Sequence, residues 1–138
     1  MGTSSPGSPP SAARILLVDD EAAFRFSAEV ALRRGGYRVE EAADGKEALR
    51  KILAARDAGD PFLIVITDIR MPVMSGIEMI DALKELGVRM EVFAITGFGD
   101  QALIDELAWK GCTETIEKPF PSEELLSRLD EILRKRGG

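Results

Sequence analysis

The sequence predicts a single α/β domain, a doubly wound sheet of five parallel strands with five helices on its two faces. From Arg14 onward, short apolar segments alternate with longer amphipathic ones, which is the pattern of repeated strand–helix units. Several apolar segments are nearly continuous, as expected of strands that helices cover on both faces. The 138 residues suffice for one domain with its own core.

Five apolar segments are the predicted strands, and their polarity indicates where each one lies in the sheet. Residues 15–18, 62–66 and 92–95 are almost entirely apolar and are predicted to be covered on both faces. Residues 37–39 and 113–116 are more polar and suit less buried positions. Parallel strands require right-handed helical connections, so the helices are distributed over both faces of the sheet.

Each predicted strand is followed by a segment with helical periodicity. The last segment is the clearest, because one face carries Leu125, Leu126, Leu129, Ile132 and Leu133. The predicted N-caps are Asp44 with Glu47, Ser75 with Glu78, and Asp100. The predicted left-handed C-caps are Gly35, Gly59, Gly87 and Gly111.

Composition and charge argue against several classes of function. The net charge of −6 disfavours binding to nucleic acid or to an anionic membrane, and no apolar segment is long enough to cross a membrane. Because Cys112 is the only cysteine and histidine is absent, we expect neither an intramolecular disulfide nor a Cys- or His-based catalytic site. A reducing, cytoplasmic location is predicted. Residues 1–12 are predicted to be a disordered leader, followed by a folded domain at 13–136.

Polar side chains gather where the predicted strands end. Asp19 and Asp20 follow the first strand, and Asp68 follows the third. Thr96 and Lys118 follow the fourth and fifth. In a doubly wound sheet, ligands bind beyond the carboxyl ends of the strands, so these side chains are predicted to converge. Each alone has an ordinary explanation, such as an acidic helix start or an exposed lysine, but their combination favours a site.

The predicted site has the chemistry of phosphoryl transfer to a carboxylate. Crowded carboxylates repel one another unless a cation is present, and Mg²⁺ prefers oxygen ligands. Asp68 is the candidate nucleophile, which would attack phosphorus and form an acyl phosphate. The Lys118 ammonium and the Thr96 hydroxyl would bind the oxygens of the phosphoryl group.

Four segments carry a resemblance to a known family. Residues 15–21 (ILLVDDE), 68–76 (DIRMPVMSG), 96–97 (TG) and 118–120 (KPF) resemble those of two-component response-regulator receiver domains. Each segment is short, but the combination is highly specific, and the likeness covers about residues 14–136. It implies a flavodoxin-like fold with the strand order 2-1-3-4-5, as in the chemotaxis regulators.

The resemblance also implies a role for each residue of the site. Asp68 would be the phosphoacceptor, and the cofactor would be Mg²⁺, with Mn²⁺ as a substitute. The implied metal ligands are Asp19 through a bound water, Asp20, Asp68 and the backbone carbonyl of Arg70. The implied phosphoryl-binding residues are Thr96, Gly97 and Lys118. A cis peptide bond between Lys118 and Pro119 is expected as well.

One position departs from the family pattern. Many receivers carry an aromatic residue three positions before the conserved lysine, and it turns inward when the phosphoryl-bound Ser or Thr shifts. Here that position is Thr115. The switch candidates are therefore Thr96, Phe98 and Thr115, where Phe98 either moves with its loop or merely packs on the next helix. Arg70 and Phe98 are also the two variable positions expected to flank the phosphoryl group.

The predicted function is a switch driven by phosphorylation. The chain would take a phosphoryl group from a sensor histidine kinase or a histidine phosphotransfer protein and act on an unknown downstream protein. It would catalyse its own phosphorylation and dephosphorylation, and without a separate substrate it is not predicted to be an enzyme. It would be a monomer or a phosphorylation-linked dimer, and either a stand-alone regulator or a receiver from a larger protein.

The alternative prediction is a pseudo-receiver that serves as a constitutive docking module. Thr115 favours this alternative, and the complete set of Asp20, Asp68, Thr96 and Lys118 opposes it. A flavin-binding electron carrier is disfavoured because an acidic loop after the first strand would repel phosphate. A dehalogenase-type phosphatase is disfavoured because that family places a second aspartate two residues after the nucleophile. Here Glu21 stands two residues after Asp19, and Arg70 two residues after Asp68.

Overall fold

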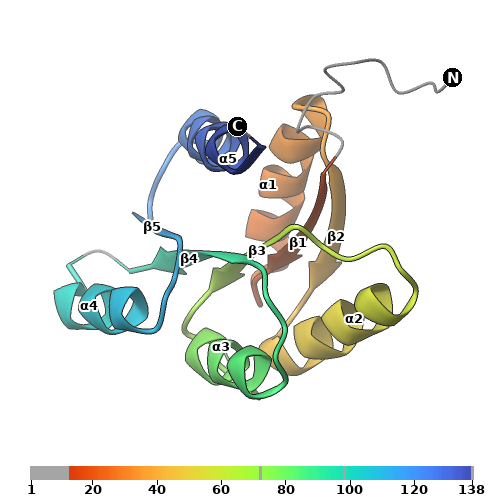
Figure 1. Cartoon of the computed structure of the whole chain (residues 1–138). Coiled ribbons are helices and arrows are strands. Elements are labelled where there is room, and N and C mark those ends of the chain that lie inside the picture. Colours follow the sequence, from red (N-terminus) through yellow and green to blue (C-terminus); the bar gives the residue numbers. More distant parts are fainter. Residues whose placement is uncertain (1–12, 72, 98, 138) are drawn as a thin grey trace, which may run out of the picture.

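The structure, a computed structural model, describes residues 13–71, 73–97 and 99–137. A parallel sheet lies between two layers of helices (Figure 1). The strands are β1 (Arg14–Val18), β2 (Arg38–Ala42), β3 (Ile64–Asp68), β4 (Glu91–Thr96) and β5 (Glu114–Glu117). The helices are α1 (Ala22–Arg34), α2 (Gly45–Asp57), α3 (Gly76–Glu85), α4 (Gln101–Trp109) and α5 (Ser122–Gly137). The strand order β2-β1-β3-β4-β5 confirms the predicted doubly wound fold.

The two layers of helices bury both faces of the central strands. α1 and α5 cover one face of the sheet, and α2, α3 and α4 cover the other (Figure 1). In β1, Ile15 and Leu17 pack on the α1 and α5 side, whereas Leu16 and Val18 pack on the opposite side. All four residues are fully buried. This alternation explains why the central strands are continuous apolar segments in the sequence.

The two more polar strands lie at the edges of the sheet, as predicted. In β5, Ile116 alone among the strand residues is buried, and in β2 the buried residues are Val39 and Ala42. Edge strands are covered less completely than central strands, so they tolerate polar side chains. No helix in the described part of the chain is long and apolar enough to cross a membrane.

The limits of β2 and β3 differ from the prediction. β2 continues beyond the predicted segment through Glu40 and Glu41, which pair with β1. β3 lies further along the chain than residues 62–66, and its last residue, Asp68, pairs with Ile95. Apolar segments indicate burial, whereas strand limits depend on backbone hydrogen bonds, which polar residues form equally well. The backbone of Asp68 is therefore held by the sheet itself.

Two of the three predicted N-caps are confirmed. The side chains of Asp44 and Ser75 accept hydrogen bonds from the backbone N–H three residues later, at 2.9 and 3.2 Å. Ser75 belongs to a reciprocal capping box at the start of α3. Asp100 occupies the N-cap position of α4, but its side chain makes no cap hydrogen bond and pairs with Arg70 instead. The guanidinium of Arg70 therefore takes the place of the backbone N–H groups of α4, which the sequence pattern predicts as the partner of Asp100.

One of the four predicted left-handed C-caps is wrong. Gly59, Gly87 and Gly111 have φ angles of 79°, 71° and 88°, as predicted. After α1, however, Gly35 has a right-handed φ of −77°, and the following Gly36 takes a φ of 95°. Either glycine permits a left-handed conformation, so the sequence does not fix which of the two adopts it.

Replacing Ser75 with alanine is expected to lower the free energy of unfolding by about 1 kcal/mol, because the first turn of α3 loses its cap. Urea unfolding followed by circular dichroism measures this change. The control is Ser127→Ala, on the exposed surface of α5, which should alter stability by less than about 0.5 kcal/mol. Equal losses in the two variants would show that the capping box has no specific contribution.

Candidate functional site

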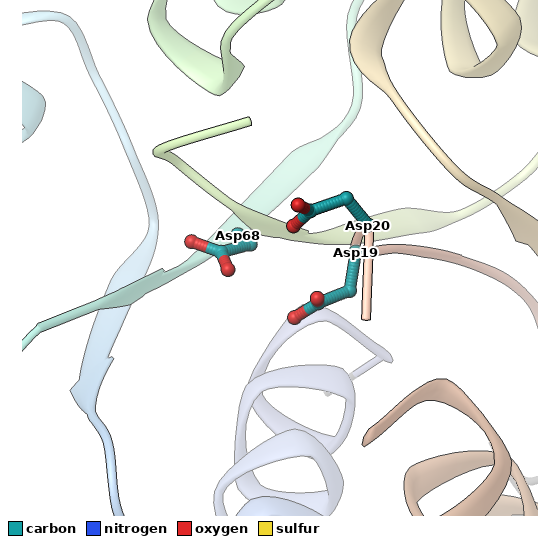
Figure 2. Close-up of side chains that lie close together, drawn as sticks. All are labelled: Asp19, Asp20 and Asp68. Carbon is teal, nitrogen blue, oxygen red and sulfur yellow. The ribbon is translucent and has the colours of Figure 1, made fainter. Parts of the chain in front are cut away.

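The predicted site residues lie together at the carboxyl edge of the sheet. Asp19 and Asp20 directly follow β1, and Asp68 ends β3 (Figure 2). Thr96 ends β4, and Lys118 directly follows β5. Because all the strands are parallel, their carboxyl ends meet at one edge, and residues far apart in the sequence become neighbours.

Three carboxylates form the centre of this site. Asp19, Asp20 and Asp68 each offer an oxygen, and these oxygens lie within 4.8 Å of one another (Figure 2). The Asp19 side chain is fully buried, the Asp68 side chain is 16% exposed, and Asp20 is exposed. Mg²⁺ binds through carboxylate and carbonyl oxygens and keeps several water ligands. The donor atoms are therefore of the kind that the predicted cation requires.

Backbone hydrogen bonds fix the orientation of two carboxylates. Oδ1 of Asp19 accepts a hydrogen bond from the N–H of Glu21 at 2.8 Å. Oδ1 of Asp68 accepts one from the N–H of Arg70 at 3.2 Å. In both aspartates the second oxygen, Oδ2, contacts the ammonium of Lys118. In each side chain, one oxygen is thus hydrogen-bonded to a backbone N–H and the other faces the Lys118 ammonium.

Several groups position the Lys118 ammonium. Its Nζ lies 3.2 Å from Asp19, 2.9 Å from Glu21 and 3.4 Å from Asp68. It also lies 4.5 Å from the centroid of the Phe24 ring, a favourable cation–π distance. Burial disfavours the charged form, but the hydrogen bond to Glu21 and the two neighbouring aspartates outweigh it, so the pKa of Lys118 is raised. Lys118 therefore stays cationic at neutral pH.

Asp19 is a carboxylate whose ionisation the fold disfavours. Burial is the largest cause and raises its pKa, the hydrogen bond from Glu21 lowers it, and the charge of Asp68 raises it again. Lys118 lowers the pKa without cancelling the shift. A pKa above its unfolded value means that ionised Asp19 destabilises the fold as the pH rises through the folded-state pKa. A bound cation would offset this destabilisation.

Thr96 has a buried hydroxyl without a hydrogen-bond partner among the described residues. The residue is 2% exposed, and its carbonyl accepts a hydrogen bond from the backbone N–H of Lys118 at 2.8 Å. A buried hydroxyl without a partner is unfavourable, so an acceptor that reached it would be bound favourably. The next residue, Gly97, is exposed, and a side chain there would meet nothing within 4 Å.

Arg70, Thr115 and Phe98 are the remaining predicted residues. Arg70 follows β3, and its guanidinium pairs with Asp100. Thr115, one of the predicted switch candidates, is a partly buried residue of β5. Phe98 lies outside the described residues. The peptide bond that follows Lys118 is cis, as predicted.

Sequence reasoning missed three contacts that α1 and the residue before it make with the site. Glu21, which ends the segment 15–21 and had no predicted role of its own, binds the Lys118 ammonium, and the Phe24 ring lies beside that ammonium. Arg25 donates a hydrogen bond to the backbone carbonyl of Asp19. Phe24 and Arg25 come three and four residues after Glu21, so the helical period places all three on one side of α1. That spacing was the available signal.

The family model of the response regulator receiver domain matches residues 15–130. Response regulator MprA of Mycolicibacterium vanbaalenii is 36% identical over 124 residues, which are 88% of this chain and 51% of that protein. Two-component response regulator ORR41 of Oryza sativa subsp. japonica is 35% identical over 114 residues, 81% of this chain and 87% of that protein. The chain spans about half the length of MprA and of the other mycobacterial regulators that it matches.

Solved structures of receiver proteins share the fold. The chemotaxis response regulator CheY4 of Vibrio cholerae superposes with a TM-score of 0.78 at 34% identity, covering 87% of this chain and 98% of that one. A CheY-like receiver domain protein from Methanospirillum hungatei gives a TM-score of 0.79 at 30% identity, covering 91% and 96%.

Proposed function

Because the chain belongs to the response regulator receiver domain family, we propose that it accepts a phosphoryl group on Asp68 and thereby switches a protein–protein interaction surface. One observation carries the proposal: the Lys118 ammonium contacts Asp68 beside two further carboxylates. The site thus combines a nucleophile, a cation for the phosphoryl oxygens and donors for a metal ion.

In the proposed reaction, a carboxylate oxygen of Asp68 attacks phosphorus. A P–O bond forms as the P–N bond of a phosphohistidine, or the P–O bond of an acyl phosphate, breaks, and its electron pair leaves with the donor. Lys118, 3.4 Å from Asp68, would bind one phosphoryl oxygen. The Thr96 hydroxyl would donate to another, with the backbone N–H of Gly97 next to it. This gives the unpartnered hydroxyl an acceptor.

The acidic residues would hold a Mg²⁺ ion, for which Mn²⁺ is a substitute. The proposed ligands are Asp20, Asp68, the backbone carbonyl of Arg70 and, through a bound water, Asp19. When bound, the ion would neutralise charge on the carboxylates and on the phosphoryl oxygens. Two observations support this site: the mutual distance of the carboxylate oxygens and the raised pKa of Asp19, due first to burial and then to the Asp68 charge.

Mg²⁺ is expected to stabilise the folded protein even without phosphorylation. At a concentration ten times its dissociation constant, the ion would add about 1.4 kcal/mol to the free energy of unfolding. Thermal unfolding with Mg²⁺ or with a chelator measures the gain. Asp20→Asn removes an exposed proposed ligand, so Mg²⁺ should stabilise this variant much less. Asp105→Asn, on the outer surface of α4, should be stabilised by Mg²⁺ as much as the native protein. An unchanged gain in Asp20→Asn would contradict this placement of the ion.

Phosphorylation is tested directly by incubating the protein with Mg²⁺ and acetyl phosphate and measuring its intact mass. We expect the mass of one added phosphoryl group, and no addition when a chelator removes the metal. If no adduct forms, beryllofluoride binding tests the pocket independently of the lifetime of the acyl phosphate. Failure of both measurements would favour the pseudo-receiver, a docking module that is not phosphorylated.

The proposed phosphoryl donor is a sensor histidine kinase or a histidine phosphotransfer protein, because the chain itself contains no histidine. Phosphorylation and dephosphorylation of the chain's own Asp68 involve no separate substrate, so the chain would be a regulator rather than an enzyme. Binding to a downstream protein, and not to nucleic acid or a membrane, is proposed as the output. The disordered leader at 1–12, the domain limits 13–136, the cytoplasmic location and a phosphorylation-linked dimer remain predictions.

A further inference from the structure

An ion pair connects the loops that follow β3 and β4. Arg70 lies two residues after Asp68, and its guanidinium binds the carboxylate of Asp100, which directly precedes α4. The side chains of Arg70 and Asp100 are 72% and 23% exposed. Ion pairs at such exposed positions contribute little to stability, so a stronger anion nearby can take the guanidinium away from Asp100.

Asp100 occupies the N-cap position of α4 without capping the helix. Its φ and ψ are −91° and 63°, and its side chain makes no hydrogen bond with the first turn. The capping residues Asp44 and Ser75, by contrast, have extended backbones and accept hydrogen bonds from their helices. Among the residues of α4, Leu107 alone is fully buried. The start of α4 therefore depends on few contacts while Asp100 is bound to Arg70.

Arg70 is attached next to the phosphoacceptor. Its backbone N–H donates a hydrogen bond to Asp68 at 3.2 Å. The side chain of Arg70 therefore starts beside the carboxylate that would carry the phosphoryl group. A phosphoryl group carries more negative charge than a carboxylate and offers oxygens that match the planar guanidinium.

We propose that Arg70 is a phosphoryl-binding residue that exchanges Asp100 for the phosphoryl group on Asp68. Asp100, once released, turns to the first N–H groups of α4 and caps the helix. The inference rests on the proposed function, since it requires an anion on Asp68. Arg70 binds Asp100 while Asp68 is unmodified, and it binds the phosphoryl group once Asp68 is phosphorylated. Phosphorylation of Asp68 thereby orders the start of α4.

The first test is the affinity for beryllofluoride, a phosphoryl analogue, in the presence of Mg²⁺ and measured by calorimetry. Arg70→Met should weaken binding about tenfold, because a charged hydrogen-bond donor is lost. Asp100→Asn should strengthen binding about two- to fivefold, because Arg70 is freed from its ion pair. The double variant should bind like Arg70→Met. The controls Arg50→Met and Asp105→Asn, on the exposed surfaces of α2 and α4, should bind like the native protein.

The second test is amide hydrogen exchange in the first turn of α4. Beryllofluoride should slow exchange there in the native protein, because Asp100 becomes a cap. In Asp100→Asn exchange should be slow from the start, because asparagine caps as well as aspartate and has no charge to pair with Arg70. In Asp100→Ala, which has no capping group, beryllofluoride should not slow exchange.

Two results would overturn the inference in distinguishable ways. If the native protein binds beryllofluoride, but Asp100→Asn binds it equally well and exchange in α4 does not respond, the exchange of partners by Arg70 is wrong and the proposed function stands. If the native protein neither binds beryllofluoride nor gains a phosphoryl group from acetyl phosphate, both the proposed function and the role of Arg70 are wrong.

Discussion

Replacing Asp68 with asparagine is expected to abolish the gain of a phosphoryl group from acetyl phosphate. The amide keeps the size of the side chain and its hydrogen bond from the Arg70 N–H, but it has no anionic oxygen to attack phosphorus. The loss should be complete within the sensitivity of an intact-mass measurement. Because shape is preserved, the variant is expected to fold, which circular dichroism checks.

Asp57→Asn is the matched control for this experiment. Asp57 lies at the end of α2 with a side chain that is 72% exposed, so the same chemical change occurs outside the site. This variant should gain a phosphoryl group at the native rate. A phosphoryl adduct on Asp68→Asn would place the acceptor elsewhere, and peptide mass spectrometry would then decide between Asp19 and Asp20.

Replacing Lys118 with methionine should slow phosphorylation by about 10²–10³-fold, the usual effect of removing one charged or hydrogen-bonding group that stabilises a transition state. Lys118 contacts Asp19, Glu21 and Asp68, and its loss leaves three carboxylates without their nearest protein cation. Negative charge would then oppose the approach of a phosphoryl donor. The rate of adduct formation at a fixed acetyl phosphate concentration measures the effect.

Lys110→Met provides the comparison for Lys118. Lys110 is a partly buried lysine that forms an ion pair with Asp81 at 2.8 Å, in a part of the molecule that contributes nothing to the site. Its loss should leave the rate unchanged. If Lys118→Met were slowed less than about twofold while remaining folded, electrostatic stabilisation by this lysine would not be part of the reaction.

The residues of the site could be predicted from the sequence because each one is tied to a strand end. Continuous apolar segments locate the central strands, and the polar residue that follows such a segment must lie at the carboxyl edge. Thr96 directly follows such a segment, and Asp68 follows one after Thr67. The structure makes each of them the last residue of its strand. Their position depends on chain topology and hardly on side-chain conformation.

The contacts that could not be predicted are those that depend on side-chain conformation or on loop geometry. The sequence assigns Asp100 to the start of α4, yet a guanidinium from the loop after β3 takes its carboxylate. Similarly, no local sequence pattern predicts the contact between the Phe24 ring and the Lys118 ammonium. In each case the contact joins two segments that are distant in the sequence, and only their arrangement in space decides whether the side chains meet.

The burial of the central strands on both faces has a consequence for how such a protein can diversify. The reacting groups are attached to strand ends whose neighbours are fixed by the core, while large apolar side chains such as Phe26 and Trp109 stand exposed on the outer surfaces of the helices. Substitutions on those surfaces leave the core and the reacting groups in place. Gene duplicates of this chain can therefore acquire new partners, and lose cross-talk with old ones, while inheriting the same chemistry.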